Sequence, residues 1–510
     1  SQRRVSPKAL ASLRARLADP AAVEALSVVD VTQALCALAR VKERSRSLLD
    51  PLAAAVRARH AELRPPQLAE ACWALAKLGV HSSPPGIWDA LEGSVVRRTQ
   101  ALNNRDLVVV AWAFATASCA RGRLLTAVAD IATPRVEQLS TKSTANLVWA
   151  FAKASADSHR ELLDALSIAC VAKADNFNEQ ELANMAWAFA TLCRPDAALF
   201  DALAATIAPR LPAFREQALA NIAWSFAKAG RVDPELFARL AERASPGLAA
   251  FCEQSVANFA WAFATSSNAD QALFDGLASA TATRAGSFSA QAVANVAWAF
   301  AKVSRDDGVV FDALARAAVD KLSGMNSQNI ANVAWAFTTV WRDDPPVFDA
   351  LSSTARAQAA SLTDQSVASI AVAFMKAGYF DAPLFAALAT EVKARPNDFS
   401  GHSIANSVWA FAKVGVRDEA LFECLAAEAR RKLDALSALD IAGVLWALLR
   451  ANAAEPDFVL ELAAAASARV SGCSEQDLSV LARTFAMLYP RLQSLRGPRA
   501  LRTRIEVRKK

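Results

Sequence analysis

A heptapeptide, ANVAWAF, occupies residues 294–300 and returns unchanged at residues 331–337, and near-copies of it recur along the chain. When the copies are aligned on their tryptophan, successive anchors lie 37–39 residues apart. A fixed period of this length is typical of a solenoid, in which one short repeat cannot bury its apolar face alone and stacks on the next. The anchors are Trp73, Trp112, Trp149, Trp187, Trp224, Trp261, Trp298, Trp335, Trp409 and Trp446, with Val372 at the same spacing and weaker copies at Cys36 and Arg483. The pattern predicts an all-α α-solenoid of about thirteen repeats.

Each repeat is expected to contain two helices. The first should begin at a Ser, Thr or Asn nine residues before the anchor, because these side chains accept from the free N–H groups of a first turn. These candidate caps are Ser27, Asn103, Ser140, Asn178, Ser289, Asn326, Thr363, Ser400, Ser437 and Ser474. Gly230, Gly378 and Gly415 mark the expected ends of first helices. The second helix should begin at an Asp nine residues after the anchor, which is Asp196, Asp233, Asp270, Asp307, Asp344, Asp381 or Asp418.

Composition agrees with helices, because hydrophobic residues make up 54% of the chain and only 16 glycines and 20 prolines interrupt it. The eight cysteines form no CxxC pair, which predicts small apolar residues in a reducing compartment rather than disulfides or zinc ligands. No charge-free apolar run reaches the length that a membrane span requires, so no span is expected.

The net charge of +6 is unevenly spread, with +6 over residues 1–60, +7 over residues 491–510 and about −7 between them. We expect a basic N-terminal segment at residues 1–24, a repeat array over 25–490 that is clearest at 177–425, and a basic tail at 491–510. The opening SQRRVSPKALASLRARLADP is rich in arginine. It is either the remnant of an organelle transit peptide or a first helix.

Positions numbered from the anchor separate into two sides of the first helix. Leu or Val at −5, Ala at −4, −1 and +3, and Phe at +2 form an apolar packed side, whereas three polar rows lie within about 60° of the anchor. The row at −7 is Gln180, Gln217, Gln254, Gln291, Gln328 and Gln365, followed by His402. The row at −3 is Asn146, Asn184, Asn221, Asn258, Asn295, Asn332 and Asn406, with Ser369 in the remaining place. The row at +4 is Lys77, Thr116, Lys153, Thr191, Lys228, Thr265, Lys302, Thr339, Lys376, Lys413 and Arg450.

These rows predict an RNA-binding surface, with lysines at phosphates and Asn or Gln at base edges or sugars. Position −6 varies most between repeats and is the candidate for distinguishing bases, since uniform rows cannot encode a sequence. The basic tail adds Arg499, Arg502, Arg504, Arg508, Lys509 and Lys510 as further RNA-binding candidates. Structural interpretations stand beside these. The Asn row is also typical of a ladder that satisfies backbone carbonyls of the next repeat, the Trp row of packing, and the Asp row of helix caps.

An enzyme is not expected. His60, His81, His159 and His402 lie far apart in the sequence, and no Gly-rich phosphate loop, HExxH or GxSxG motif occurs. Thirteen repeats leave no length for a separate catalytic domain, and no cofactor or metal is expected.

The repeat F-[ST/N]-x-Q-x-[LV]-A-N-x-A-W-A-F-A-[KT]-x-G, followed by D-x-x-L-F-D-A-L, resembles the octotricopeptide repeat family and is similar to the heptatricopeptide repeats. The resemblance covers residues of about 25–490. It implies a right-handed superhelix with first helices on its concave side, in an RNA-binding protein of a mitochondrion or chloroplast that acts in RNA stability, processing or translation. The Pro-rich stretch of many octotricopeptide units and a RAP-like C-terminal domain are absent from the pattern.

Two other functions remain open on the sequence. One is a structural subunit of a large ribonucleoprotein such as the mitochondrial ribosome, holding rRNA and neighbouring proteins. The other is a protein-binding scaffold of the kind that other α-solenoids provide.

Overall fold

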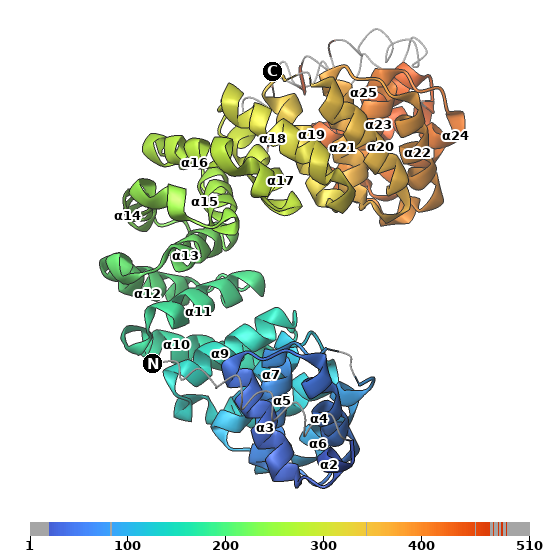
Figure 1. The fold of residues 1–510 in the computed structure, drawn as a ribbon. Coiled ribbons are helices and arrows are strands. Elements are labelled where there is room, and N and C mark those ends of the chain that lie inside the picture. The colour runs from blue at the N-terminus through green and yellow to red at the C-terminus, as the bar shows by residue number, and fades with distance from the viewer. Residues whose placement is uncertain are drawn as a thin grey trace. The chain divides into compact units, whose positions relative to one another are not determined.

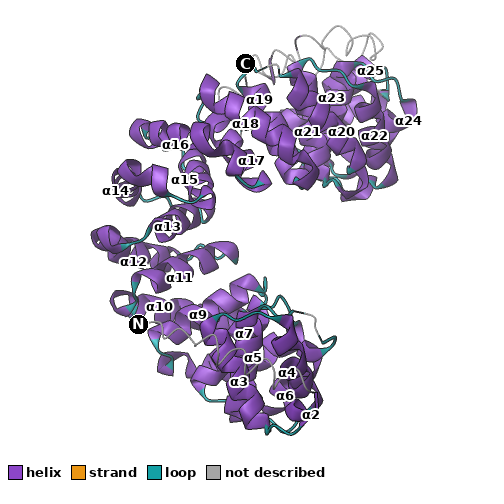
Figure 2. Cartoon of the chain, viewed as in Figure 1, coloured by secondary structure: helices purple, strands orange, loops and turns teal. Residues whose placement is uncertain are grey.

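The computed structural model describes residues 20–81, 84–342, 344–453 and 455–469, together with residues 473, 478, 481, 482 and 486. Within these residues the chain is helical, and no strand occurs (Figure 2). The first 19 residues, the weak anchor Arg483, the candidate cap Ser474 and the basic tail all lie outside the described residues.

The chain divides into two compact units, Ser1–Phe251 with Asp270–Leu273, and Cys252–Ala269 with Phe274–Lys510. In the first unit a short helix α2 (Pro20–Glu24) precedes six helix pairs (Figure 1). These pairs are α3 (Val28–Val41) with α4 (Arg46–Ala58), α5 (Pro65–Leu78) with α6 (Ile87–Arg98), α7 (Asn104–Thr116) with α8 (Gly122–Ala132), α9 (Thr141–Lys153) with α10 (Arg160–Ala172), α11 (Glu179–Thr191) with α12 (Ala197–Ile207), and α13 (Glu216–Lys228) with α14 (Pro234–Ala244).

The second unit repeats the same arrangement. Its pairs are α15 (Glu253–Thr265) with α16 (Gln271–Arg284), α17 (Ala290–Lys302) with α18 (Gly308–Lys321), α19 (Ser327–Thr339) with α20 (Pro345–Ala357), α21 (Asp364–Ala377) with α22 (Ala382–Ala394), α23 (Gly401–Val414) with α24 (Glu419–Arg431), and α25 (Ala438–Ala451) with α26 (Pro456–Arg469). Within each unit, successive first helices pack directly against one another. The predicted all-α solenoid of two-helix repeats is therefore confirmed. The right hand of its superhelix stays a prediction.

The caps of the first helices are where the sequence places them. In nine repeats the predicted Ser, Thr or Asn side chain accepts a hydrogen bond from the backbone N–H three residues later, as Ser140 does from Ser143. The phenylalanine just before the cap is buried in the repeats that carry it. This is the place of a hydrophobic staple, which fixes the direction in which the chain enters the helix.

First helices end at a residue with positive φ six positions after the anchor. Gly230, Gly378 and Gly415 adopt φ values of 64°, 71° and 87°, which confirms the predicted ends. Other repeats place Ser, Cys or Asn there, and one places a tryptophan, Trp341, with φ 55°. The left-handed conformation reverses the chain in one residue, so the second helix can run back along the first.

The aspartate caps of the second helices are confirmed in all seven repeats. Each carboxylate accepts from the backbone N–H three residues on, at 2.7–3.3 Å. In five of these repeats, the phenylalanine four residues after the Asp then packs edge-to-face on the Phe at +2 of the next repeat, with ring centroids 5.1–5.8 Å apart. Aromatic contacts of this geometry add about 0.5–1.5 kcal/mol each to burial. The LFDAL motif therefore links neighbouring repeats through the core.

A basic side chain at the end of the second helix, or in the short 3-10 turn that follows it, closes each of nine repeats. It donates to a backbone carbonyl just before the first helix of the same repeat, and we call this contact the basic clasp. In the Trp187 repeat, for example, Arg210 donates to the carbonyl of Phe177 at 2.8 Å. The clasp residues are Arg59, Arg98, Arg135, Lys173, Arg210, Lys321, Arg395, Lys432 and Arg469. The sequence analysis did not find this row, although it recurs at a fixed distance of 14 residues before the next anchor.

Candidate nucleic-acid interface

Positions −7, −3, 0 and +4 form one stripe along each first helix, which we call the first-helix face. The glutamines at −7 are exposed, the asparagines at −3 and the anchors are half-exposed, and the lysines at +4 are exposed. Residues spaced by three and four positions share one side of a helix, so the stripe follows directly from the sequence period. The predicted candidates of the array thus share one surface in each unit.

The anchors of neighbouring repeats stack on one another. Trp112, Trp149 and Trp187 form one run in the first unit, and Trp261, Trp298 and Trp335 form another in the second. Ring centroids within these runs lie 6.1–6.5 Å apart, with interplanar angles of 28–34°. A base inserted between two rings needs two van der Waals contacts, or about 7–8 Å. The tryptophans therefore pack between repeats, as one interpretation predicted, and they leave no room for bases within these runs.

The asparagines do not form the ladder that one interpretation of the sequence predicted. Among the described residues, the side-chain amides of Asn146, Asn184, Asn221, Asn258, Asn295 and Asn332 make no hydrogen bond. Only Asn406 differs, because its amide contacts Nε2 of His402 at 2.9 Å while His402 Nδ1 lies 2.9 Å from Asp440. The Asn row is a line of amides open to a ligand.

The lysine row is equally open. Within the described part of the chain, Lys77, Lys153, Lys228, Lys302 and Lys376 are exposed and have no ion pair or hydrogen bond. At the C-terminal end, Lys413 and Arg450 both lie over the ring of Trp446, at 5.8 and 5.4 Å from its centroid. Where threonine alternates with lysine, Oγ1 of Thr116, Thr191 and Thr265 is buried without a partner, and Oγ1 of Thr339 donates to the carbonyl of Trp335, so the openness of this row lies in its lysines. The tail candidates, from Arg499 to Lys510, lie outside the described residues.

Position −6 is not a free reading position, and this prediction is wrong. It is the third helical residue, where the side chain closes the helix cap or is buried. Glu181 and Asp440 complete capping boxes with Asn178 and Ser437, and Ser403 accepts from the Ser400 hydroxyl. The spacing of a Ser or Asn followed three residues later by an acid is itself the signature of a capping box. That signal was present in the sequence.

Two further basic residues lie on the first-helix face. Arg105 and Lys142 occupy position −7 in the Trp112 and Trp149 repeats, and both are exposed. From the Trp112 repeat to the Trp446 repeat, the four rows contain no Asp or Glu. The acidic balance of the array thus comes from elsewhere, in large part from the Asp caps of the second helices. The first-helix face is positive although the array as a whole is negative.

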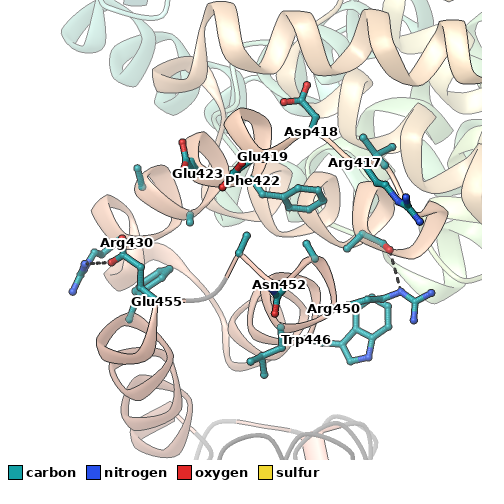
Figure 3. A pocket seen from close by; sticks show the side chains of 18 of the residues that line it. Arg417, Asp418, Glu419, Phe422, Glu423, Arg430, Trp446, Arg450, Asn452 and Glu455 are labelled. Carbon is teal, nitrogen blue, oxygen red and sulfur yellow. Dashed lines mark hydrogen bonds and ion pairs between the residues drawn. The ribbon is translucent and has the colours of Figure 1, made fainter. Parts of the chain in front are cut away.

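A groove of about 1500 Å³ opens at the C-terminal end of the second unit, between α24, α25 and the start of α26 (Figure 3). Phe422 and Phe458 lie at its base, and Trp446 and Arg450 of the first-helix face reach its rim. Arg430 contacts Glu455 and Glu461 across it. Three arginines and four carboxylates line the groove, so charge favours neither an anion nor a cation there.

The side chains that thiol or metal chemistry would require can be located in the part of the chain that the structure describes. No group of three or more His, Cys, Asp or Glu side chains is placed to hold a metal ion there. Burial raises the pKa of the Cys36 thiol to about 11 and that of Cys170 to about 12, so these cysteines are unreactive core residues. Among the described helices, none combines the length and the apolar character needed to cross a bilayer.

Comparison with known families decides the relationship. The sequence profile of the RNA-editing substrate-binding complex 6 protein family matches residues 91–340 and 307–456, which together span most of the chain. The chain belongs to this family. The RNA-editing substrate-binding complex 6 profile covers the helix pairs from α7 to α25, including most of the first-helix face. The resemblance to octotricopeptide repeats stays a prediction beside it.

No curated protein sequence matches the chain. Among solved structures, similarity extends to a homology model of the full-length AP-3 complex, with 10% identity over 96% of this chain and 93% of that one and a TM-score of 0.27. Kap121p bound to Ste12p matches with 12% identity, 97% and 59% coverage and a TM-score of 0.28. The pentatricopeptide repeat protein PPR10 from maize matches with 12% identity, 96% and 97% coverage and a TM-score of 0.24. TM-scores this low carry no inference about function.

Proposed function

We propose that this chain is a non-catalytic RNA-binding protein that holds single-stranded RNA along its first-helix face. The observation that carries the proposal is the pairing of two open rows, unpaired lysines at +4 and unbonded amides at −3, on a stripe of the first helices whose four rows contain no Asp or Glu from the Trp112 repeat to the Trp446 repeat. Lysines without a protein partner supply the phosphate contacts that dominate affinity for nucleic acids. Membership of a family described as RNA-editing substrate-binding supports the same ligand class.

The face is suited to the RNA backbone rather than to its sequence. A base-by-base code requires side chains that vary from repeat to repeat and point at the ligand. Here the exposed rows are nearly uniform, the variable position −6 is engaged in helix caps, and the stacked tryptophans admit no base. We therefore propose binding through phosphates and sugars, with little preference for sequence.

The cellular role follows from the family description. We propose that the chain works within an assembly that binds RNA-editing substrates, in a mitochondrion or chloroplast, where it affects RNA processing or stability. The octotricopeptide resemblance supports the organelle. The ribosomal alternative and the pure scaffold remain predictions that no contact in the structure favours.

Purified protein should be titrated with fluorescently labelled 20-nucleotide RNAs, and anisotropy should be recorded at 100 mM KCl. Single strands of unrelated sequence should bind within a few-fold of one another, and an RNA duplex of the same length should bind more weakly. Affinity for one sequence that exceeds the others by 100-fold would contradict backbone binding. Absence of binding to every RNA would refute the proposal and leave the protein scaffold.

A further inference from the structure

Between Trp73 and Trp446, one anchor of the first-helix face is not aromatic. Val372 stands in α21 where each neighbouring first helix carries a tryptophan, and it is half-exposed. Position −3 of the same helix is Ser369, in a row that elsewhere in this unit is asparagine until its last repeat. Two adjacent places on the face therefore carry smaller side chains than those of α19 and α23 on either side.

The rest of this repeat keeps the residues that build the fold. Thr363 caps α21, Gly378 ends it, and Asp381 caps α22. Phe374 packs edge-to-face on Phe348 as the equivalent rings do elsewhere. The capping and core aromatic residues of this repeat are therefore kept, although Met375 replaces the alanine usual at +3.

The helix that carries Val372 packs against a first helix on each side. α21 packs directly against both α19 and α23, and these helices follow one another in Figure 1. Beside Val372, the Thr338 hydroxyl donates to the carbonyl of Ala373 at 3.2 Å, which ties α19 to α21. α19 and α21 are therefore in direct contact beside Val372.

The absent ring uncovers two aromatic faces. Among the ring and cation–π contacts of the described residues, Trp335 has one partner, Trp298, and Trp409 has none. A nucleobase is a planar ring system of about the size of an indole, and it can take the place of the absent one.

The rim of this gap suits a nucleotide. Lys376, exposed and without a partner in the described chain, stands one turn along the same helix face, within reach of a phosphate that flanks an inserted base. Ser369 and Gln365 continue the stripe on the other side, with no hydrogen bond to the described residues. The surroundings of Val372 thus combine two aromatic rings, an ammonium group and open polar side chains.

We propose that the gap at Val372 binds one nucleobase of the RNA, stacked between Trp335 and Trp409, with Lys376 on a neighbouring phosphate. This inference rests on the proposed function, because it places one base of the bound strand. Along the stacked tryptophan runs, the bases of the bound strand would not insert between the rings. The gap would hold the strand at one fixed point of an otherwise uniform face.

Filling and enlarging the gap test the proposal. V372W restores an indole, whereas V372A keeps the gap open and serves as the matched control. The probe is a 12-nucleotide oligouridine RNA with one central 2-aminopurine, whose emission is quenched when the base stacks. V372W should lose roughly 5- to 100-fold in affinity, the equivalent of one stacked base. It should also regain the emission that binding quenches in the wild type, while V372A keeps wild-type affinity within about twofold.

The outcomes separate the two proposals. If V372W binds and quenches like the wild type, the base site is refuted and RNA binding along the face stands. If V372W and V372A weaken binding equally, position 372 acts through the fold and the base site is again refuted. If the wild-type protein binds none of the probe, the proposed function fails and the base site fails with it. Thermal unfolding of V372W, expected at or above the wild-type temperature, shows that its loss of affinity does not come from misfolding.

Discussion

Four lysines of the +4 row allow the proposed contact with RNA phosphates to be tested through the salt dependence of RNA affinity. Changing Lys153, Lys228, Lys302 and Lys376 to glutamine keeps most of each side chain and removes its charge. Because none of the four has a partner among the described residues, the folded state loses no ion pair of that part of the chain. The variant should therefore unfold within about 0.5 kcal/mol of the wild type.

The expected magnitude follows from counterion release. Each phosphate neutralised on a single strand contributes about 0.7 to the slope of log affinity against log salt concentration. Four lost contacts lower the slope by at most about 2.8. Between 50 and 200 mM KCl, the wild type should thus lose roughly 50-fold more affinity than the variant. Anisotropy titrations of one 20-nucleotide RNA at four or five salt concentrations measure both slopes.

A matched control removes the same charge from the opposite side of the repeats. Arg123, Arg160, Arg316 and Arg356 are exposed on second helices, and they have no ion pair with the described residues. Their change to glutamine should leave the slope within about 0.7 of the wild type, the effect of one contact. If both variants lower the slope equally, net charge rather than the lysine row governs binding. An unchanged slope in the lysine variant would refute phosphate contact by this row.

Three further expectations concern stability. Removing the α14 cap with D233A should cost about 0.5–2 kcal/mol in urea unfolding, since the N–H of Leu236 loses its acceptor; an unchanged midpoint would contradict that role. R210Q removes one clasp and should lower the free energy of unfolding by about 1–2 kcal/mol. R160Q changes an exposed arginine and should leave that free energy nearly unchanged in the same urea titration. A hydrogen bond from Lys393 holds the pKa of Asp418 below its ordinary value. The ionised Asp418 carboxylate therefore stabilises the folded state fully above about pH 4, and this stabilisation is lost as the pH falls through the lowered pKa. Acid titration of D418N should lack this part of the unfolding, and an acid transition identical to that of the wild type would argue against it.

Local signals predicted the elements well. Asp233 followed by Pro234, or Ser140 nine residues before Trp149, fixes a helix start through the geometry of a single turn, so no tertiary information is needed. The period of the anchors then predicts the stacking of repeats, because identical segments bury identical faces. The solenoid, the caps and the membership of the three polar rows in one stripe could all be predicted in this way.

The roles of the polar rows could not be predicted from spacing alone. An asparagine row and an arginine row can each satisfy backbone carbonyls, and the choice depends on which side chain ends beside the carbonyl. Here Arg210 reaches Phe177 across 33 residues of sequence, while Asn184 faces outward. That contact joins the two ends of a repeat and is invisible to a helical wheel. The error at position −6 was different, since Asn178 and Glu181 carry a local capping signature that should have outweighed their variability.

The basic clasp also determines where the repeats can change length. Five of the nine clasps join residues 33 positions apart, as in Arg135 to Leu102. Lys173 and Arg98 reach the equivalent carbonyl 34 and 35 positions back, in longer repeats. Lys321 and Arg469 bond carbonyls two and three residues earlier than the equivalent one, 35 and 36 positions back. The longer repeats accommodate their extra residues between the paired helices, where six residues separate α9 from α10 and eight separate α5 from α6, compared with five between α11 and α12. The extra residues therefore lie in the loop between the two helices of one repeat, within the segment that the clasp closes. The polar rows of neighbouring first helices then stay aligned. The hairpin between paired helices is therefore the natural place to graft a tag, a reporter or an additional domain without disturbing the array.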